Sequence, residues 1–238
     1  MTALPKGTVL SVAPTGVHSA DDVPGLPVAP EEVARAVADC ERVGASVVDL
    51  VPRADTVLAD VVMAVRERSA QLIRITAHAR SEPLGALLDS GADIVVCPLG
   101  APAGFADDLR ARAAALGITV HYEATSLDEL RKLPPDASHV VLVFDGQGMP
   151  GDVRTFSAAI ELLPEGVSYT AAGAGDASMP VMLAALAAGG HLRVGLADTT
   201  EYAEDTPARD NAQLVARAAG LAKIAQRPPL ADAAEVLT

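Results

Sequence analysis

The sequence predicts a (β/α)8 barrel, and three observations lead to this fold class. Short apolar segments alternate with longer helical patterns through eight strand–helix cycles. Most of the apolar segments are rich in β-branched residues and lack strict polar alternation, as expected of strands that are buried on both faces. A length of 238 residues suits one large domain of this class. An open, doubly wound sheet has the same order of elements, because periodicity alone does not show closure.

We expect one domain over residues 1–238, with the last helices closing the barrel. The expected strands are residues 9–13, 46–51, 72–76, 93–97, 119–123, 139–144, 168–172 and 191–196. The expected helices are residues 30–43, 56–68, 82–90, 103–116, 126–133, 153–163, 177–188, 209–225 and 230–237.

Local signals support these helix boundaries. Pro30 and the acids after it suit a first helical turn, where a missing N–H costs little and the helix dipole favours negative charge. Ser126 and Glu129 have the spacing of a capping box. Glycines that end helices follow four of the segments, at Gly44, Gly91, Gly117 and Gly189.

Composition excludes several classes of protein. A net charge of -13 disfavours binding to nucleic acid or to an anionic membrane, because both require a basic surface. No apolar run approaches the roughly 18 residues of a membrane span, and the N-terminus has no export signal. Cys40 and Cys97 form no disulfide framework; Cys40 fits a buried helix face, and Cys97 ends a strand where it would line a site or the core. We expect a reduced, cytoplasmic protein.

In a barrel of this class the catalytic side chains lie at the C-terminal ends of the strands. Polar residues at the expected ends are His18, Asp49, Arg53, Thr76, His78, Glu123, Asp145, Asp176, Arg193 and Asp198. Loop residues that merely face water account for about half of such positions. That explanation fits Asp49 and Arg193 less well, because both lie in apolar strands.

Several motifs occur in a consistent order along the chain. The run GGHLRVGLAD spans residues 189–198, GASVVDLVPR spans residues 44–53 and AGAG spans residues 172–175. Thr15-Gly16 precedes Leu26-Pro27 and Pro30-Glu31-Glu32, and Arg227-Pro228 lies near the end. Together they resemble the β-keto acid cleavage enzymes, the family of 3-keto-5-aminohexanoate cleavage proteins, over nearly the whole chain.

The resemblance implies a retro-Claisen type of acyl transfer on a small β-keto acid, with acetyl-CoA as co-substrate. By position in the family pattern, the expected catalytic residues are Arg193, Asp198, Asp49 and Thr76. The expected substrate-binding residues are Arg53, His18, Glu123, Gly173 and Gly175. Asp176 stands where the family has an arginine after the strand-seven glycines, which reverses the charge there. The family also implies a homo-oligomer.

The family's zinc is held by two histidines of a His-x-His motif and by a late glutamate. In this chain those positions hold Asp49, Val51 and Ala197, and only the first carries a metal-binding group. We therefore expect the family zinc to be lost and no cofactor to be bound. The alternative is a rebuilt metal site from Asp49, His18 and His78.

Two functions follow. The first is an enzyme that cleaves or transfers acyl groups on a small anionic oxo acid, with Arg193 and Asp198 retained. The second is a non-catalytic barrel that binds a small anionic metabolite or serves as an oligomer subunit.

Overall fold

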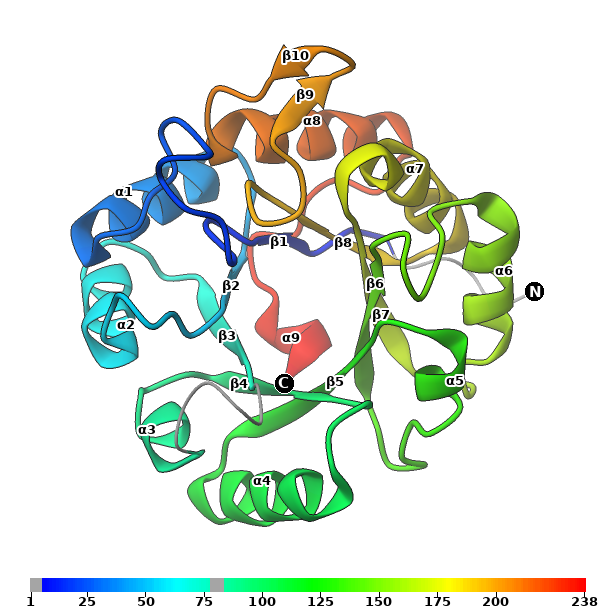
Figure 1. Cartoon of the computed structure of the whole chain (residues 1–238). Helices are drawn as coiled ribbons and strands as arrows, with labels where there is room; N and C mark the ends of the chain where they lie inside the picture. Colours follow the sequence, from blue (N-terminus) through cyan, green and yellow to red (C-terminus); the bar gives the residue numbers. More distant parts are fainter. Residues whose placement is uncertain (1–5, 78–83) are drawn as a thin grey trace.

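The computed structural model describes residues 6–77 and 84–238. Eight parallel strands close into a barrel in sequence order, with helices around the outside (Figure 1). Closure is shown by β1 (Leu10–Val12), which pairs with β8 (His191–Val194) on one side and with β2 on the other. The remaining barrel strands are β2 (Val47–Leu50), β3 (Leu72–Thr76), β4 (Ile94–Pro98), β5 (Thr119–Ala124), β6 (His139–Phe144) and β7 (Ser168–Gly173). The predicted barrel is confirmed, and the open sheet is excluded.

Helices follow the strands as expected, and most boundaries lie within two residues of the predicted ones. They are α1 (Pro30–Arg42), α2 (Leu58–Arg66), α3 (Leu84–Leu88), α4 (Ala103–Leu116), α5 (Leu127–Leu130), α6 (Val153–Glu161), α7 (Ser178–Ala188), α8 (Asn211–Ile224) and α9 (Ala234–Leu237). A 3-10 turn, η1 (Gly175–Ala177), precedes α7.

Two differences from the expected elements have local causes. Helix α9 begins later than predicted because the Leu230 amide donates to the Thr8 carbonyl (2.9 Å), which holds residue 230 in an extended segment beside the N-terminus. A short hairpin, β9 (Glu201–Ala203) and β10 (Thr206–Pro207), lies in the segment between β8 and α8. It was not predicted because the segment is short, rich in acidic residues and without an apolar run, which is the pattern of a loop.

The main core lies between the barrel and its helices. Helix α1 contributes one apolar face, consisting of Val33, Ala34, Val37 and Cys40. Cys97 also belongs to this core rather than to the barrel interior. Burial raises the pKa of Cys40 to about 12 and that of Cys97 to about 11. No helix in residues 6–77 or 84–238 is long and apolar enough to cross a membrane.

The N-terminal end of the barrel is closed by α9. Leu237 and Ala233 pack against Val9, Val47 and Ile94, which lie at or just before the first residues of β1, β2 and β4. In Figure 1 this helix lies at the centre of the ring of strands. The apolar plug leaves only the opposite end of the barrel available for chemistry.

Above the plug the barrel interior is unusually polar. Three buried histidines lie side by side: the ring centroid of His139 is 4.4 Å from that of His121 and 6.2 Å from that of His191. His121 Nε2 bonds to the carbonyl of Leu237 (2.8 Å), and His191 Nδ1 accepts from the Val9 amide (3.0 Å). Burial lowers the pKa of all three imidazoles, to about 3 for His121 and about 4 for His191. They are uncharged packing residues at neutral pH.

Candidate functional site

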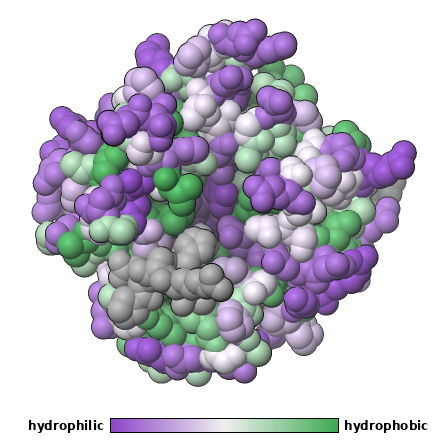
Figure 2. Space-filling model, in the orientation of Figure 1, coloured by the Kyte–Doolittle hydropathy of each residue, from purple (hydrophilic) through white to green (hydrophobic). Residues whose placement is uncertain are grey.

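The face drawn in Figure 2 is hollowed at the centre of the barrel, where hydrophilic residues lie. Arg193, on β8, is the central cation at this mouth of the barrel. Its Nη2 donates to Asp198 Oδ1 (2.9 Å) and its Nε to Asp198 Oδ2 (3.3 Å), and Nη1 donates to Glu123 Oε2 (3.3 Å). The Arg193 and Glu123 side chains are each 12% exposed and Asp198 is 7% exposed. The structure therefore brings together three of the residues predicted for the site.

The backbone after β8 fixes Asp198 above Arg193. Gly195 has a φ of 154°, and a Cβ there would lie 2.1 Å from the Ala13 carbonyl oxygen, so only glycine fits this close approach to β1. The amides of Asp198 and Thr199 both donate to the Gly195 carbonyl (3.0 Å each), which closes a tight turn. This turn allows Asp198, five residues after Arg193, to form a two-point ion pair with it.

Asn211, the first residue of α8, holds this turn against the loop after β1. Its Oδ1 accepts from the Leu196 amide (2.8 Å), and its Nδ2 donates to the Pro14 carbonyl (3.0 Å). The side chain is buried, so both bonds are shielded from water. Asp210 caps the same helix by accepting from the Gln213 amide (2.7 Å). Asn211 was not singled out from the sequence, because this helix was expected to start at residue 209.

Burial and charge act in opposite directions on the central pair. Burial alone would lower the pKa of Arg193, but the carboxylates of Asp198, Glu123 and Asp49 raise it above its ordinary value. Burial raises the pKa of Asp198, and this effect outweighs the opposing influence of Arg193. Asp198 is consequently a stronger base than an exposed aspartate.

Asp49, on β2, is paired with a second charged residue inside the barrel. Its Cα is paired in register with that of Arg74 on β3, and the two side chains form a two-point ion pair inside the barrel. Arg74 Nη2 donates to Asp49 Oδ2 (2.7 Å) and Nε to Asp49 Oδ1, while Nη2 also reaches Ser11 Oγ (3.2 Å). Sequence reasoning missed Arg74. The available signal was a charged residue in the middle of an apolar strand, two positions before Thr76.

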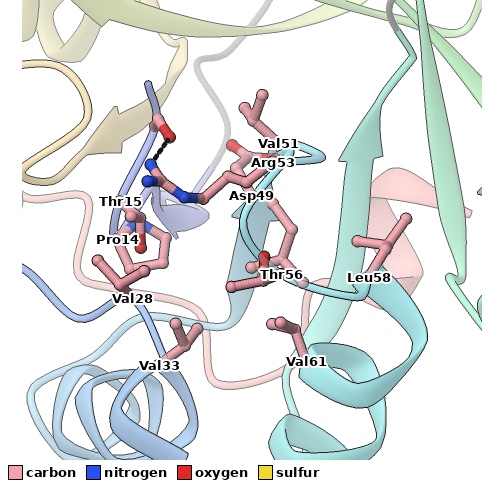
Figure 3. A pocket seen from close by; sticks show the side chains of 12 residues that line it. Pro14, Thr15, Val28, Val33, Asp49, Val51, Arg53, Thr56, Leu58 and Val61 are labelled. Carbon is pink, nitrogen blue, oxygen red and sulfur yellow. Dashed lines mark hydrogen bonds between the residues drawn. The ribbon is translucent and has the colours of Figure 1, made fainter. Parts of the chain in front are cut away.

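Arg53 lies at the edge of the mouth, over a pocket between α1 and α2 (Figure 3). Its Nη1 donates to the carbonyls of Gly16 (2.9 Å) and His18 (2.8 Å), and its Nη2 pairs with Asp55 (2.7 Å). Arg53 thus ties the loop after β2 to the loop after β1. An electrostatic interaction with the His18 side chain opposes the rise in the pKa of Asp198, which places His18 near the centre.

Gly173, which ends β7, and Gly175, which follows it, have tight geometry. A Cβ on Gly173 would lie 2.4 Å from the Ala177 carbonyl oxygen. The Gly175 amide donates to the Asp198 carbonyl (2.9 Å), and the Ala174 amide to that of Phe144 (2.9 Å). These amides are engaged within the protein, and the glycine turn braces the backbone of Asp198. Thr76 is buried at the end of β3.

The donor set at the family's metal positions does not fit zinc. Val51 and Ala197 carry no donor atom, and both carboxylate oxygens of Asp49 face Arg74. His78, which belongs to the alternative rebuilt site, lies outside the described residues. Within the part of the chain that the structure describes, no group of three or more His, Cys, Asp or Glu residues is arranged to hold a metal ion.

Comparisons with known proteins agree with this architecture. A family model for beta-keto acid cleavage enzymes matches residues 7–236. The solved structure titled "Ternary complex of ObcA with C4-CoA adduct and oxalate" is similar with a TM-score of 0.68 and 16% identity, over 88% of this chain. This chain spans 66% of the length of that chain. A truncated 3-deoxy-D-arabino-heptulosonate 7-phosphate synthase from Thermotoga maritima is similar with a TM-score of 0.61 and 12% identity, over 94% of this chain and 89% of that chain.

At such low identity the two solved structures establish the fold alone. The family model covers nearly the whole chain, and its match includes the motifs around Arg53, Gly173 and Arg193. The chain belongs to the beta-keto acid cleavage enzyme family.

Proposed function

We propose that this chain catalyses a β-keto acid cleavage type of acyl transfer on a small anionic oxo acid, without the family's zinc. The observation that carries the proposal is the Arg193 centre, where one buried guanidinium lies between Asp198 and Glu123 at the open end of the barrel. The ObcA complex contains a CoA adduct and oxalate, which supports acetyl-CoA as the co-substrate and a small acid as the substrate.

Asp198 supplies the base in this proposal. It removes a proton from the carbon between the keto and carboxylate groups, and Arg193 donates hydrogen bonds to the oxygen that gains negative charge. The carbon then attacks the acetyl carbon of acetyl-CoA, and CoA leaves as its thiolate. That thiolate attacks the substrate's keto carbon, the carbon–carbon bond breaks, and protonated Asp198 returns its proton. The products are acetoacetate and a new CoA ester.

In this proposal Glu123 is the residue that the substrate displaces from Arg193. Arg193 is already paired with two carboxylates, so a substrate carboxylate binds by displacing one of them. The Glu123 contact is 3.3 Å, whereas Asp198 makes a two-point contact whose shorter distance is 2.9 Å, so the Glu123 side is the one that we propose opens. Asp198 keeps its two-point contact and stays within reach of the reacting carbon.

A second candidate is a non-catalytic relative that binds a small anionic metabolite. The paired state of Arg193 favours it, because a guanidinium held by two carboxylates is stable without substrate. Under this function the chain binds oxo acids but forms no CoA ester.

A direct assay separates the two. The purified protein is incubated with acetyl-CoA and a panel of β-keto acids, and new CoA esters are detected by mass spectrometry. Turnover that is lost in Asp198→Asn and kept in the matched surface variant Asp128→Asn supports the enzyme. Ligand-dependent thermal stabilisation without any CoA ester, across the whole panel, would instead support the binding protein.

A further inference from the structure

Arg74 is a buried cation that the proposed reaction does not use. Its side chain has 0% exposure, and its partner Asp49 has 5%. Register places them together, since Asp49 and Arg74 are directly paired across the β2–β3 ladder and project to the same face of the sheet. A guanidinium inside a barrel is costly to desolvate, so its retention there requires a compensating charge.

That compensation comes from the residue at the family's first metal position. Asp49 gives both oxygens to Arg74, and Ser11 Oγ accepts a further bond from Nη2 (3.2 Å). Arg74 Nη1 is buried and has no hydrogen-bond partner among the described residues. The guanidinium is therefore directed at Asp49 and keeps the two N–H donors of Nη1 to spare.

The pair is also coupled to the Arg193 centre. The negative charge of Asp49 raises the pKa of both Arg193 and Asp198, so the three groups lie within electrostatic range in a poorly screened interior. A divalent cation at this mouth would face the positive charges of Arg74 and Arg193 together. To bind it, Asp49 would have to release Arg74 and leave a buried guanidinium unpaired.

We propose that Arg74 is the resident cation of this site: it takes the place of the metal beside Asp49, and its charge excludes a divalent metal ion from the barrel mouth. The loss of the metal is thus not only the loss of two ligands at Val51 and Ala197. It is a replacement, in which a protein cation holds the remaining carboxylate. Exclusion of a metal by Arg74 does not depend on whether the chain cleaves a β-keto acid.

The test returns the missing ligands and varies only residue 74. The background Val51→His/Ala197→Glu supplies an imidazole and a carboxylate beside Asp49, which together make a possible zinc ligand set. In this background Arg74 is kept, replaced by Met, or replaced by Lys. Zinc stoichiometry is measured by elemental analysis, zinc affinity by competition with a chelating dye, and folding by circular dichroism.

We expect the Arg74→Met form to bind one zinc ion at least about 100-fold more tightly than the form that keeps Arg74, because a fixed positive charge no longer opposes the ion. Arg74→Lys retains the charge with less bulk and should bind as weakly as Arg74. If Arg74→Met unfolds the protein because Asp49 is left unpaired, the series is repeated with Asp49→His added. This substitution removes the buried carboxylate.

Three results would overturn the proposal. Equal zinc affinity with Arg74 and Met would show that the guanidinium excludes nothing. Tight binding by the Lys form would assign the effect to space rather than charge. Failure of every folded variant to bind zinc would show that another feature of the mouth excludes the metal.

Discussion

Glu123 and Arg193, which are 70 residues apart in sequence, meet at the barrel mouth with 3.3 Å between Oε2 and Nη1. Glu123 is the second-last residue of β5 and Arg193 lies on β8, so the contact spans the barrel rather than a single ladder. Together with Asp198 it surrounds one guanidinium with two carboxylates.

Replacing Asp198 with Asn should reduce turnover by about 100-fold to 10,000-fold, because the base is lost while the side-chain volume is retained. The measurement is kcat/KM for the β-keto acid that the panel assay identifies, with circular dichroism to verify the fold. Arg193→Lys should lower the same parameter, since an ammonium cannot reproduce the two-point contact. Full activity in both variants would contradict the catalytic assignment.

The pH dependence of kcat/KM should report Asp198. Burial raises the pKa of this carboxyl, and a base must be ionised to act, so activity should rise with pH through a value above the usual aspartate range of about 4. In Asp198→Glu, residual activity should keep a rising acid limb at a changed midpoint. A limb that is identical in the wild type and this variant would assign the titration to another group.

The three interior histidines should make the fold sensitive to acid. Each is held uncharged in the folded state, with a pKa of about 3 for His121, about 4 for His191 and a strongly lowered value for His139. Below about pH 6.5 the unfolded chain takes up protons that the folded chain does not, so stability falls as pH falls. The loss is about 1.4 kcal/mol per pH unit for each histidine.

Urea denaturation between pH 7 and pH 5 measures this loss. His139→Gln removes one titrating group from the stack, and the dependence of unfolding free energy on pH should become shallower by about one proton. A slope that is unchanged in this variant would show that His139 does not remain neutral on folding.

Arg227 should be a strong determinant of stability. Its Nη1 donates to the carbonyls of Gly190 (2.8 Å) and Leu186 (3.3 Å), and its Nη2 to those of Gly189 (2.8 Å) and Gly7 (3.0 Å). Arg227 thus joins its own segment and the segment of Gly7 to the turn before β8. Arg227→Met should lower the free energy of unfolding by about 3 kcal/mol or more, because buried carbonyls lose a charged donor.

Arg131, whose exposed ion pair with Asp128 spans one helical turn, is the matched control. Arg131→Met should change the free energy of unfolding by less than about 1 kcal/mol. Similar losses for the two arginines in urea denaturation would contradict a specific role for Arg227.

Both cysteines should be inert in the folded protein. Cys40 and Cys97 are buried, and burial raises the pKa of each thiol to about 12 and about 11, so little thiolate is present at neutral pH. Labelling by a thiol reagent should be about 100-fold slower than in denaturant. Rapid labelling of one cysteine without unfolding would place it at an accessible site.

The barrel was predictable from the sequence because each of its signals is local. Buried β-branched strands, helix-starting residues such as Ser126 and helix-ending glycines such as Gly117 act within one turn or one strand. The Ser126 cap is confirmed, with its side chain accepting from the Glu129 amide, and Gly117 adopts a left-handed φ of 71°. The positions of Arg193 and Asp198 also followed from the strand order, since the C-terminal ends of parallel strands meet at one mouth.

The state of Asp49 was decided only by the tertiary structure. From the sequence we expected Asp49 at a family metal position, whereas in the barrel the β2–β3 register places Arg74 beside it and uses both its oxygens. Register, closure and the direction of a side chain inside a barrel depend on contacts between strands distant in sequence. Sequence therefore determined which elements form and which residues end their strands, and packing decided which charges meet.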